Sequence, residues 1–224
     1  MLIRNAYQAS SINSMLSSLN CLFSFLNRND CRVKHIKVQR KLYCPEEREL
    51  SKEEYTRLVN AAEKSGNERL NLILQTICGT GIRVSELKYI TVEAVKARLV
   101  SVALKGKSRV VFIVNSLRKK LLKYACLNNI KAGSIFVTRT GRPIDRVSIW
   151  RAMKALCKKA GVNPDKVYPH NLRHLFARVF YGLEKDIVKL ADILGHSSIE
   201  TTRIYVISTG REHRKCMEKM RLII

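Results

Sequence analysis

Six side chains from separate parts of the chain have the types needed to transfer a phosphoryl group without a metal ion. They are two arginines, two histidines, a lysine and a tyrosine: Arg83, Lys105, His170, Arg173, His196 and Tyr205. Guanidinium groups neutralise phosphoryl oxygens, a lysine or histidine can protonate a leaving oxygen, and a tyrosine hydroxyl can attack phosphorus. These residue types together predict metal-independent cleavage of a phosphodiester.

Taken singly, each of these residues also has an ordinary structural interpretation. Arg83 and Lys105 would be solvated surface cations, His196 a turn residue, and Tyr205 a packed ring with an exposed hydroxyl. His170 and Arg173 are one helical turn apart and therefore share a helix face, which makes this pair the least easily explained as chance.

Other catalytic chemistries have no sequence signal. The chain contains no phosphate-binding P-loop, no dinucleotide-binding glycine pattern after a strand, no carboxylate cluster of the metal-nuclease kind and no His-Glu-x-x-His. We therefore expect no cofactor and no bound metal.

The charge balance predicts a polyanionic partner. Lys and Arg number 42 against 18 Asp and Glu, a formal net charge of +24 spread along the whole chain. Such a surface is matched to the phosphate backbone of nucleic acid. The seven cysteines form no Cys-x-x-Cys pair, which favours reduced thiols in a cytoplasmic protein. No apolar run is long enough for a membrane span, and no signal-peptide pattern is present.

Two regions are predicted to hold these side chains. Apolar residues at helical spacing indicate a helix over 11–26, and a basic segment over 27–47 without periodicity indicates a linker. The capping box formed by Ser51 and Glu54 then opens a second, longer domain. The expected organisation is a helical arm with its linker over 1–47 and a larger domain over 48–224.

The second region is predicted to be mostly helical with one small antiparallel sheet. Two β-branched runs separated by a basic turn indicate a hairpin over 98–114. A second capping box, Ser197 to Glu200, is expected to start the helix that carries Tyr205. The remaining expected elements are helices from Ser51, over 68–78, 116–128, 147–160, 170–182 and 184–194, and a short strand over 134–138.

Four segments, taken in order, resemble the tyrosine recombinase family, also called the phage integrases. They are TGIRVSEL (80–87), LKGKSR (104–109), HNLRH (170–174) and LGHSSIETTRIY (194–205). The resemblance spans about residues 48 to 210. It implies an α+β, mostly α, tyrosine recombinase catalytic domain preceded by a short helical arm, the shortened remnant of a core-binding region.

The resemblance implies a role for each cationic residue. Arg83 and Arg173 would hold the phosphoryl oxygens, with Glu86 supporting the site one turn after Arg83. Lys105 would protonate the departing 5′ oxygen, although Lys107 is an alternative because it lies only two residues away.

The resemblance also implies the nucleophile and its helpers. Tyr205 would form a 3′-phosphotyrosine link, and His170 would remove or balance the proton of its hydroxyl. His196 would donate a further hydrogen bond to the phosphoryl group. The reaction is then strand cleavage and rejoining at specific sites in DNA integration, excision or resolution.

The implied partners are double-stranded DNA, further copies of the chain assembled as a tetramer on DNA, and accessory DNA-bending proteins. The implied location is the nucleoid of a bacterial or archaeal cell. The amphipathic tail over 211–224 would dock on a neighbouring subunit or on its own domain. Three alternatives remain: a type IB topoisomerase, a helix-turn-helix regulator built on 184–206, and a catalytically silent, DNA-binding relative.

Overall fold

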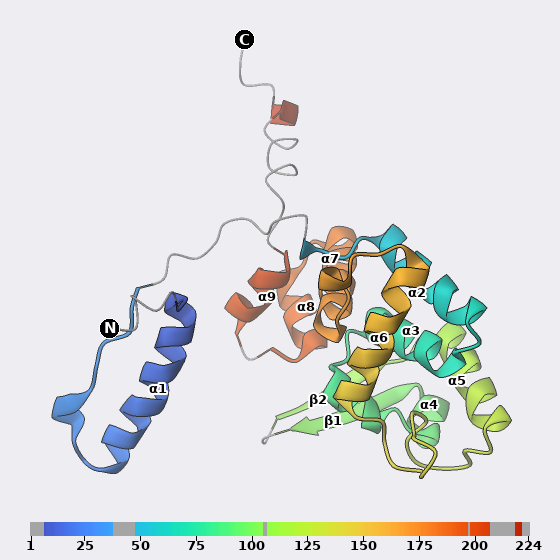
Figure 1. Cartoon of the computed structure of the whole chain (residues 1–224), viewed down its shortest axis with the longest axis horizontal. Helices are drawn as coiled ribbons and strands as arrows, with labels where there is room; N and C mark the ends of the chain where they lie inside the picture. Colours follow the sequence, from blue (N-terminus) through green and yellow to red (C-terminus); the bar gives the residue numbers. More distant parts are fainter. Residues whose placement is uncertain (1–6, 38–47, 105–106, 197, 207–217, 221–224) are drawn as a thin grey trace. The chain divides into compact units, whose positions relative to one another are not determined.

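The computed structural model describes residues 7–37, 48–104, 107–196, 198–206 and 218–220 (Figure 1). The chain divides into two compact units, Met1–Leu42 and Tyr43–Ile224. The carboxyl-terminal tail, for which a docking role was expected, lies almost entirely outside the described residues.

The described part of the first unit holds a helix, a short 3₁₀ helix η2 (Asn29–Cys31) and an extended segment that runs back along the first helix. Helix α1 spans Ala9–Phe25 and carries Asn13 and Asn20 two turns apart. Asn20 both donates to the Val33 carbonyl and accepts from the Val33 amide at 2.9 Å. Asn13 makes the same pair of bonds with Ile36 at 2.8 Å. Two amide side chains of α1 thus hold the backbone of this stretch as a neighbouring strand would, and the assignment of residues 27–47 to a linker stays a prediction.

The second unit opens with two helices whose first turns are both capped by side chains. Helix α2 spans Lys52–Lys64, and Ser51 and Glu54 form the expected reciprocal capping box. Helix α3, Glu68–Thr80, is capped by Asn67, whose side chain accepts from the Leu70 amide. The predicted helical starts in this region are confirmed.

The rest of the second unit is mostly helical with a two-stranded antiparallel sheet, which confirms the predicted fold class. In chain order it contains a 3₁₀ helix η4 (Val84–Tyr89), α4 (Val92–Ala97), β1 (Leu99–Leu104), β2 (Lys107–Phe112), α5 (Asn115–Leu127), α6 (Arg146–Ala160), the short 3₁₀ helix η5 (Pro164–Lys166), α7 (Pro169–Glu184), α8 (Ile187–Leu194) and α9 (Ile199–Val206). Among the described residues, no helix is both long and apolar enough to cross a bilayer.

The hairpin has one buried and one exposed face. Its register pairs Val100 with Val111 and Val102 with Arg109. The three valines are at most 2% exposed, whereas Val110 and Phe112 on the other face are 44% and 64% exposed. Arg109 therefore extends from the buried face, among valines.

Helix α7 joins the two buried clusters of the unit. Its residues Leu172 and Leu175 belong to the main core, which gathers side chains from α2, α3, α5 and α6. Ala177, two residues after Leu175, belongs to a smaller cluster with Leu190, Leu194 and Tyr205. Figure 1 shows α7, α8 and α9 gathered on one side of the unit. Helix α7 thus connects the core to the elements that carry the predicted site.

Three local expectations need correction or completion. Residues 134–138 form no strand but only isolated bridges, Thr91 with Ser134 and Val137 with Pro143, since a proline has no amide to extend a ladder. Helix α4 was not anticipated. Of the second expected capping box, Ser197 lies outside the described residues, and the Glu200 amide donates to the Ser198 hydroxyl at 3.2 Å.

Candidate active site

Arg83 is held at the point where α3 gives way to η4. Gly81 ends α3 in the left-handed conformation, φ +65°, and a Cβ there would lie 2.6 Å from the Phe176 ring. Arg83 then caps η4, and its amide donates to Glu86 Oε2 at 2.9 Å. Its guanidinium Nη1 donates to Glu86 Oε1, also at 2.9 Å, while its side chain stays 39% exposed. Arg83 is thus fixed on one side and open to a ligand on the other.

Glu86 is fully buried and serves two arginines. Besides Arg83, it accepts a hydrogen bond on Oε2 from Arg109 Nη2 of β2. Burial alone would raise the pKa of Glu86, but the hydrogen bonds from Arg83 and the charges of Arg109 and Arg83 hold it below its ordinary value. Glu86 therefore stays ionised at neutral pH. The structure places Glu86 against Arg83, as the resemblance implies. The second partner of Glu86, Arg109, was not predicted from the sequence.

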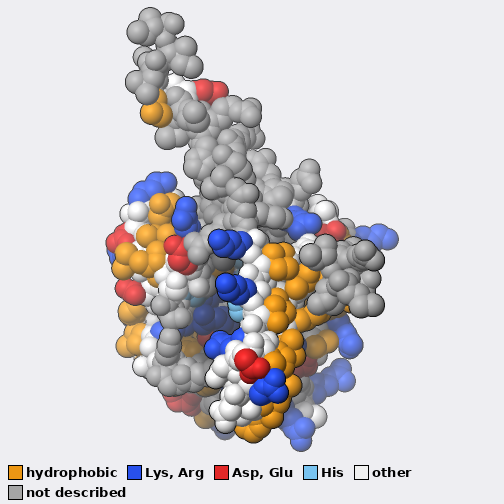
Figure 2. All heavy atoms as spheres, turned by 90° about the vertical axis from the view of Figure 1, so that its left-hand side faces the viewer, with side chains coloured by type: hydrophobic (Ala, Val, Ile, Leu, Met, Phe, Trp, Pro, Cys, Tyr) orange, Lys and Arg blue, Asp and Glu red, His pale blue; other side chains and the backbone are white. Residues whose placement is uncertain are grey.

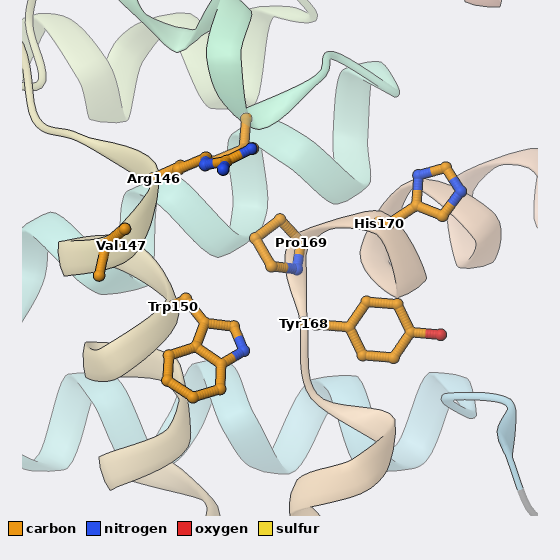
Figure 3. Close-up of a pocket in the computed structure, with 7 residues that line it drawn as sticks. Arg146, Val147, Trp150, Tyr168, Pro169 and His170 are labelled. Carbon is orange, nitrogen blue, oxygen red and sulfur yellow. The ribbon is translucent and has the colours of Figure 1, made fainter. Parts of the chain in front are cut away.

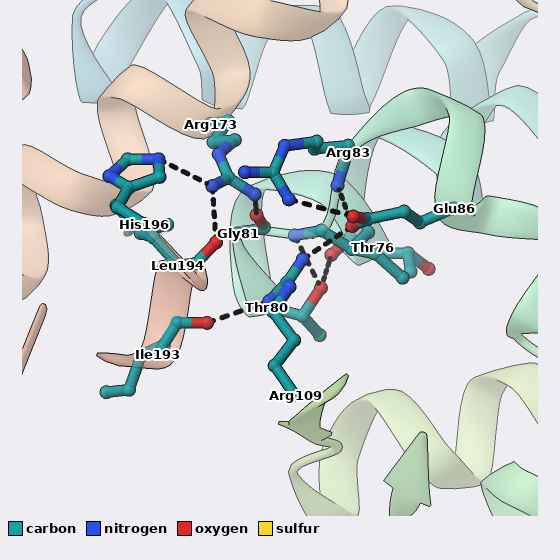
Figure 4. A network of polar contacts seen from close by, with 11 residues as sticks. Thr76, Thr80, Gly81, Arg83, Glu86, Arg109, Arg173, Ile193, Leu194 and His196 are labelled. Atoms are coloured by element: carbon teal, nitrogen blue, oxygen red, sulfur yellow. Dashed lines mark hydrogen bonds and ion pairs between the residues drawn. The ribbon is translucent and has the colours of Figure 1, made fainter. Parts of the chain in front are cut away.

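Arg173 is the most deeply buried cation of the site, with 1% of its surface exposed. Its Nη1 donates to the Gly81 carbonyl at 2.6 Å and its Nη2 to the Leu194 carbonyl at 2.7 Å. Burial, and then the charge of Arg83, lower the pKa of Arg173 to about 10, so it remains a cation at neutral pH. Figure 4 shows its guanidinium beside that of Arg83. The two arginines expected to hold a phosphoryl group lie together.

His196 completes this polar network from the turn after α8. Its Nε2 lies 2.9 Å from Arg173 Nη2, and its Nδ1 lies 2.8 Å from the hydroxyl of buried Thr202. A guanidinium only donates, so Nε2 accepts and Nδ1 carries the proton given to Thr202. Burial, followed by the charge of Arg173, lowers the pKa of His196 to about 4. In this arrangement His196 is neutral, and its predicted donation to a phosphoryl group requires Nε2 to leave Arg173 and to gain a proton.

Tyr205 lies in the same chain's site, packed among imidazole rings. Helix α9 carries it with 6% of its surface exposed, and its hydroxyl lies 3.3 Å from His170 Nε2. Its ring stacks on His174 with centroids 4.1 Å apart and lies 5.2 Å from the His196 ring. Burial, and then the charges of Arg173 and Arg83, lower the pKa of His170. His170 is therefore neutral near pH 7 and able to accept the tyrosyl proton.

His174 is a third histidine that the sequence analysis did not assign. It lies one turn after His170 on α7, and the two rings meet edge to face at 4.7 Å. Burial, and then the charge of His170, lower its pKa to about 4. The spacing of the histidines in HNLRH places both on one helix face and was the available signal.

The predicted lysine is not among the described residues. Lys105 lies outside them, and Lys107 begins β2 opposite Leu104. The choice between the two lysines stays a prediction. Of the six predicted residues, the structure brings five together: Arg83, His170, Arg173, His196 and Tyr205.

An apolar pocket of about 290 Å³ adjoins the site at the start of α7 (Figure 3). His170 belongs to both, and Val84 follows Arg83 directly. The lining residues come from η4, α6 and the start of α7: Val84, Arg146, Val147, Trp150, Tyr168, Pro169 and His170. The site therefore has room beside it for an apolar group.

The gathered groups are suited to a phosphodiester. Two guanidiniums can neutralise non-bridging oxygens, and a phenol next to a neutral imidazole can lose its proton as it attacks. The ionised Glu86 offsets only part of the charge of Arg83, Arg109 and Arg173, so the site keeps a net positive charge for an anion. On the face seen in Figure 2, Lys and Arg side chains are also more widespread than Asp and Glu.

Comparison with known proteins gives consistent matches. The model of the phage integrase family matches residues 48–211. Tyrosine recombinase XerA of Pyrococcus horikoshii is 30% identical over 229 residues, covering 98% of this chain and 77% of that protein. Tyrosine recombinase XerH of Campylobacter jejuni is 36% identical over 166 residues, covering 70% of this chain and 47% of that protein.

Solved structures share the fold. A crystal structure of XerA recombinase matches with a TM-score of 0.68 at 27% identity, covering 99% of this chain and 79% of that one. A post-cleavage complex of XerH with a palindromic difH substrate matches with a TM-score of 0.74 at 20% identity, covering 94% of this chain and 65% of that one.

Proposed function

The chain belongs to the phage integrase family, and on that premise we propose that Tyr205 cleaves a DNA strand by attacking its phosphodiester. Its relatives are named tyrosine recombinases, so it is an enzyme that breaks and rejoins DNA at specific sites. The residue assignment rests on the position of the Tyr205 hydroxyl, which lies 3.3 Å from His170 Nε2. The Tyr205 ring also lies beside the His196 ring, which in turn is hydrogen-bonded to the buried Arg173.

The cleavage step conserves atoms and charge within the site. The Tyr205 oxygen forms a bond to phosphorus as its proton passes to His170, and the bond from phosphorus to the 5′ oxygen breaks. Arg83 and Arg173 stabilise the charge that grows on the non-bridging oxygens. Lys105, or Lys107 in its place, gives the proton that the leaving 5′ oxygen needs.

Rejoining is the reverse of the same step. The 3′-phosphotyrosine retains the energy of the phosphodiester, so a 5′ hydroxyl from another strand can displace Tyr205 without ATP. His170 then returns a proton to the tyrosyl oxygen. The site therefore needs the same residues in both directions.

The proposed substrate is double-stranded DNA. The net charge of +24 supports it, and so does the capture of the related XerH on a difH substrate. We assign residues 1–47 to the part of a DNA clamp that precedes the catalytic domain over 48–224. A tetramer on DNA, accessory DNA-bending proteins and a place at the nucleoid belong to the same proposal.

The contacts of Tyr205 do not favour a helix-turn-helix regulator. A recognition helix presents its side chains to the major groove. Tyr205 instead turns inward, 6% exposed, against His174 of its own chain. The catalytically silent relative and the topoisomerase are separated from the recombinase by the following experiment.

Covalent trapping tests the proposal. The protein is incubated with randomised duplexes carrying a nick, so that the released 5′ fragment diffuses away and the adduct accumulates. Adducts that survive denaturation are recovered and sequenced, which also identifies the site. We expect an adduct in the wild type and none in Tyr205→Phe, which should still bind the recovered duplex.

Two other outcomes would contradict the proposal. DNA binding with no adduct would identify a silent relative. Adducts without any shared sequence, together with relaxation of unrelated plasmids, would identify a topoisomerase.

We further propose that Tyr205 acts in its own subunit, supported by its contacts with His170 and His174 of the same chain. The test mixes Tyr205→Phe protein with Arg83→Ala protein on the recovered site. Neither subunit then holds a complete site if cleavage occurs within one chain, so no adduct should form. Adduct formation in the mixture alone would show that the tyrosine is exchanged between subunits.

A further inference from the structure

Arg109 is an arginine in a position where an apolar side chain would be expected. It extends from the buried face of the hairpin opposite Val102, and its side chain is 9% exposed. Burying a guanidinium among valines is costly unless it is paired and hydrogen-bonded. Burial lowers the pKa of Arg109, and the charge of Glu86 opposes that effect. The partners of Arg109 therefore explain why the chain tolerates it there.

Those partners lie in two other segments of the site. Arg109 Nη2 donates to Glu86 Oε2, whose other oxygen accepts from Arg83. Arg109 Nη1 donates to the Ile193 carbonyl at 2.8 Å, in the last turn of α8 (Figure 4). One guanidinium thus connects the support of Arg83 with the helix end that precedes His196.

The turn before His196 is packed against the Arg109 stem. Gly195 has φ +64°, and a Cβ on it would lie 2.1 Å from Arg109 Cδ. The next carbonyl along the helix, that of Leu194, is held by Arg173. Two buried arginines therefore bind successive carbonyls at the end of α8, where helical carbonyls lack partners and cations are favourable.

From this geometry we propose that Arg109 is a positioning residue for strand cleavage. Through Glu86 it fixes the guanidinium of Arg83, and through the Ile193 carbonyl it fixes the turn that carries His196. Arg109 does not itself contact the phosphoryl group. The inference rests on the proposed function, because positioning has meaning only if this site cleaves DNA.

Single-turnover cleavage of the trapped site by three variants tests this role. Arg109→Met keeps the length of the stem and removes both hydrogen bonds, and we expect cleavage to fall about 100-fold, as for a displaced catalytic group. Arg109→Lys keeps a positive charge that can hydrogen-bond well to only one of the two partners, so its cleavage rate should fall less than that of Arg109→Met. Arg69→Met is the matched control, since Arg69 also donates to a carbonyl, that of Val137, but touches no site residue.

Measuring cleavage below the unfolding transition separates positioning from stability. Arg109→Met leaves the buried Glu86 carboxylate with one arginine, and its Tm should fall. At a temperature well below that Tm, where circular dichroism shows Arg109→Met to be fully folded, its cleavage should still be about 100-fold slower than that of the wild type. Wild-type cleavage by Arg109→Met at that temperature would show that Arg109 only stabilises the fold and would overturn the proposal.

A second substrate tests the link to Arg83. A methylphosphonate at the scissile position lacks one charged oxygen and so depends less on guanidinium groups. We expect the deficit of Arg109→Met to shrink to less than about tenfold on this substrate. If Arg109→Met cleaves both substrates with the same reduction in rate, or with no reduction on either, Arg109 does not act through Arg83 and the proposal is wrong. If the wild type forms no adduct at all, the proposed function fails rather than this inference.

Discussion

The phosphate-holding and nucleophile-holding halves of the site are built differently. Arg173, Glu86 and Arg109 are buried, and each has charged or carbonyl partners on separate elements. Tyr205 lies on an eight-residue helix and has one 3.3 Å hydrogen bond and stacked rings. Directional bonds fix the position of a charge, whereas stacking tolerates small displacement. The cationic half is therefore preorganised, whereas the nucleophile can adjust its position.

Replacing the most constrained cation should have the largest effect. In Arg173→Lys a single ammonium cannot reach both the Gly81 and Leu194 carbonyls while also binding His196. We expect single-turnover cleavage to fall about 1,000-fold, because a preorganised transition-state donor is lost, together with a lower Tm. Arg69→Lys is the control. Cleavage within tenfold of the wild type would show that the cationic half is not preorganised.

Removing the charge that joins two arginines should have the next largest effect. Glu86→Gln keeps the side-chain shape but leaves Arg83 and Arg109 without a counterion, and we expect cleavage to fall about 100-fold. The pKa of Glu86 is lowered from 4.5, so its stabilisation is present above that pH and is lost as pH falls through the folded value. The difference in Tm between wild type and Glu86→Gln should therefore narrow below pH 4.5. A constant difference would contradict this pairing.

The nucleophile half should respond to ring shape rather than to charge. His174→Ala removes the stacked partner of Tyr205, and we expect cleavage to fall about tenfold, the value of one aromatic contact. His174→Phe keeps a ring at the same place and should stay within about threefold of the wild type. If Phe were as harmful as Ala, the polar atoms of His174 would matter and the comparison would need revision.

The smallest effect concerns stability at mildly acidic pH. The pKa of His196 is lowered from 6.5 to about 4, so the unfolded chain binds more protons between these values. Stability is then complete above pH 6.5 and decreases as pH falls toward 4. We expect Tm of the wild type to decline over this range, and the decline to be shallower in His196→Gln by a few degrees. Parallel curves would show that His196 is not held neutral.

Local patterns in the sequence predicted most of the helices, because capping and amphipathic spacing depend on residues within one or two turns. The capping box of Ser51 and Glu54 and the hairpin at 98–114 are clear examples. The strand expected over 134–138 failed because bridge formation depended on partners distant in sequence, Thr91 among them. The bonds from Asn13 and Asn20 to the backbone of residues 36 and 33 were not predicted either, because they join positions 23 and 13 residues apart.

The residue types in the family-like motifs also predicted the catalytic candidates without any knowledge of the distances between them. Arg83, His170, Arg173, His196 and Tyr205 each stand in a short motif that is legible in one dimension. The excess of basic residues predicted a phosphate-bearing partner in the same way. These conclusions needed only the order of residues along the chain.

Only the tertiary structure decided how those candidates are supported. Arg109 and His174 gained their importance from contacts with Ile193 and Tyr205, 84 and 31 positions away. The engagement of His196 Nε2 by Arg173 likewise joins two elements. The physical reason is that burial and hydrogen bonding between distant segments exist only once the core has brought those segments together, so no local pattern can encode them.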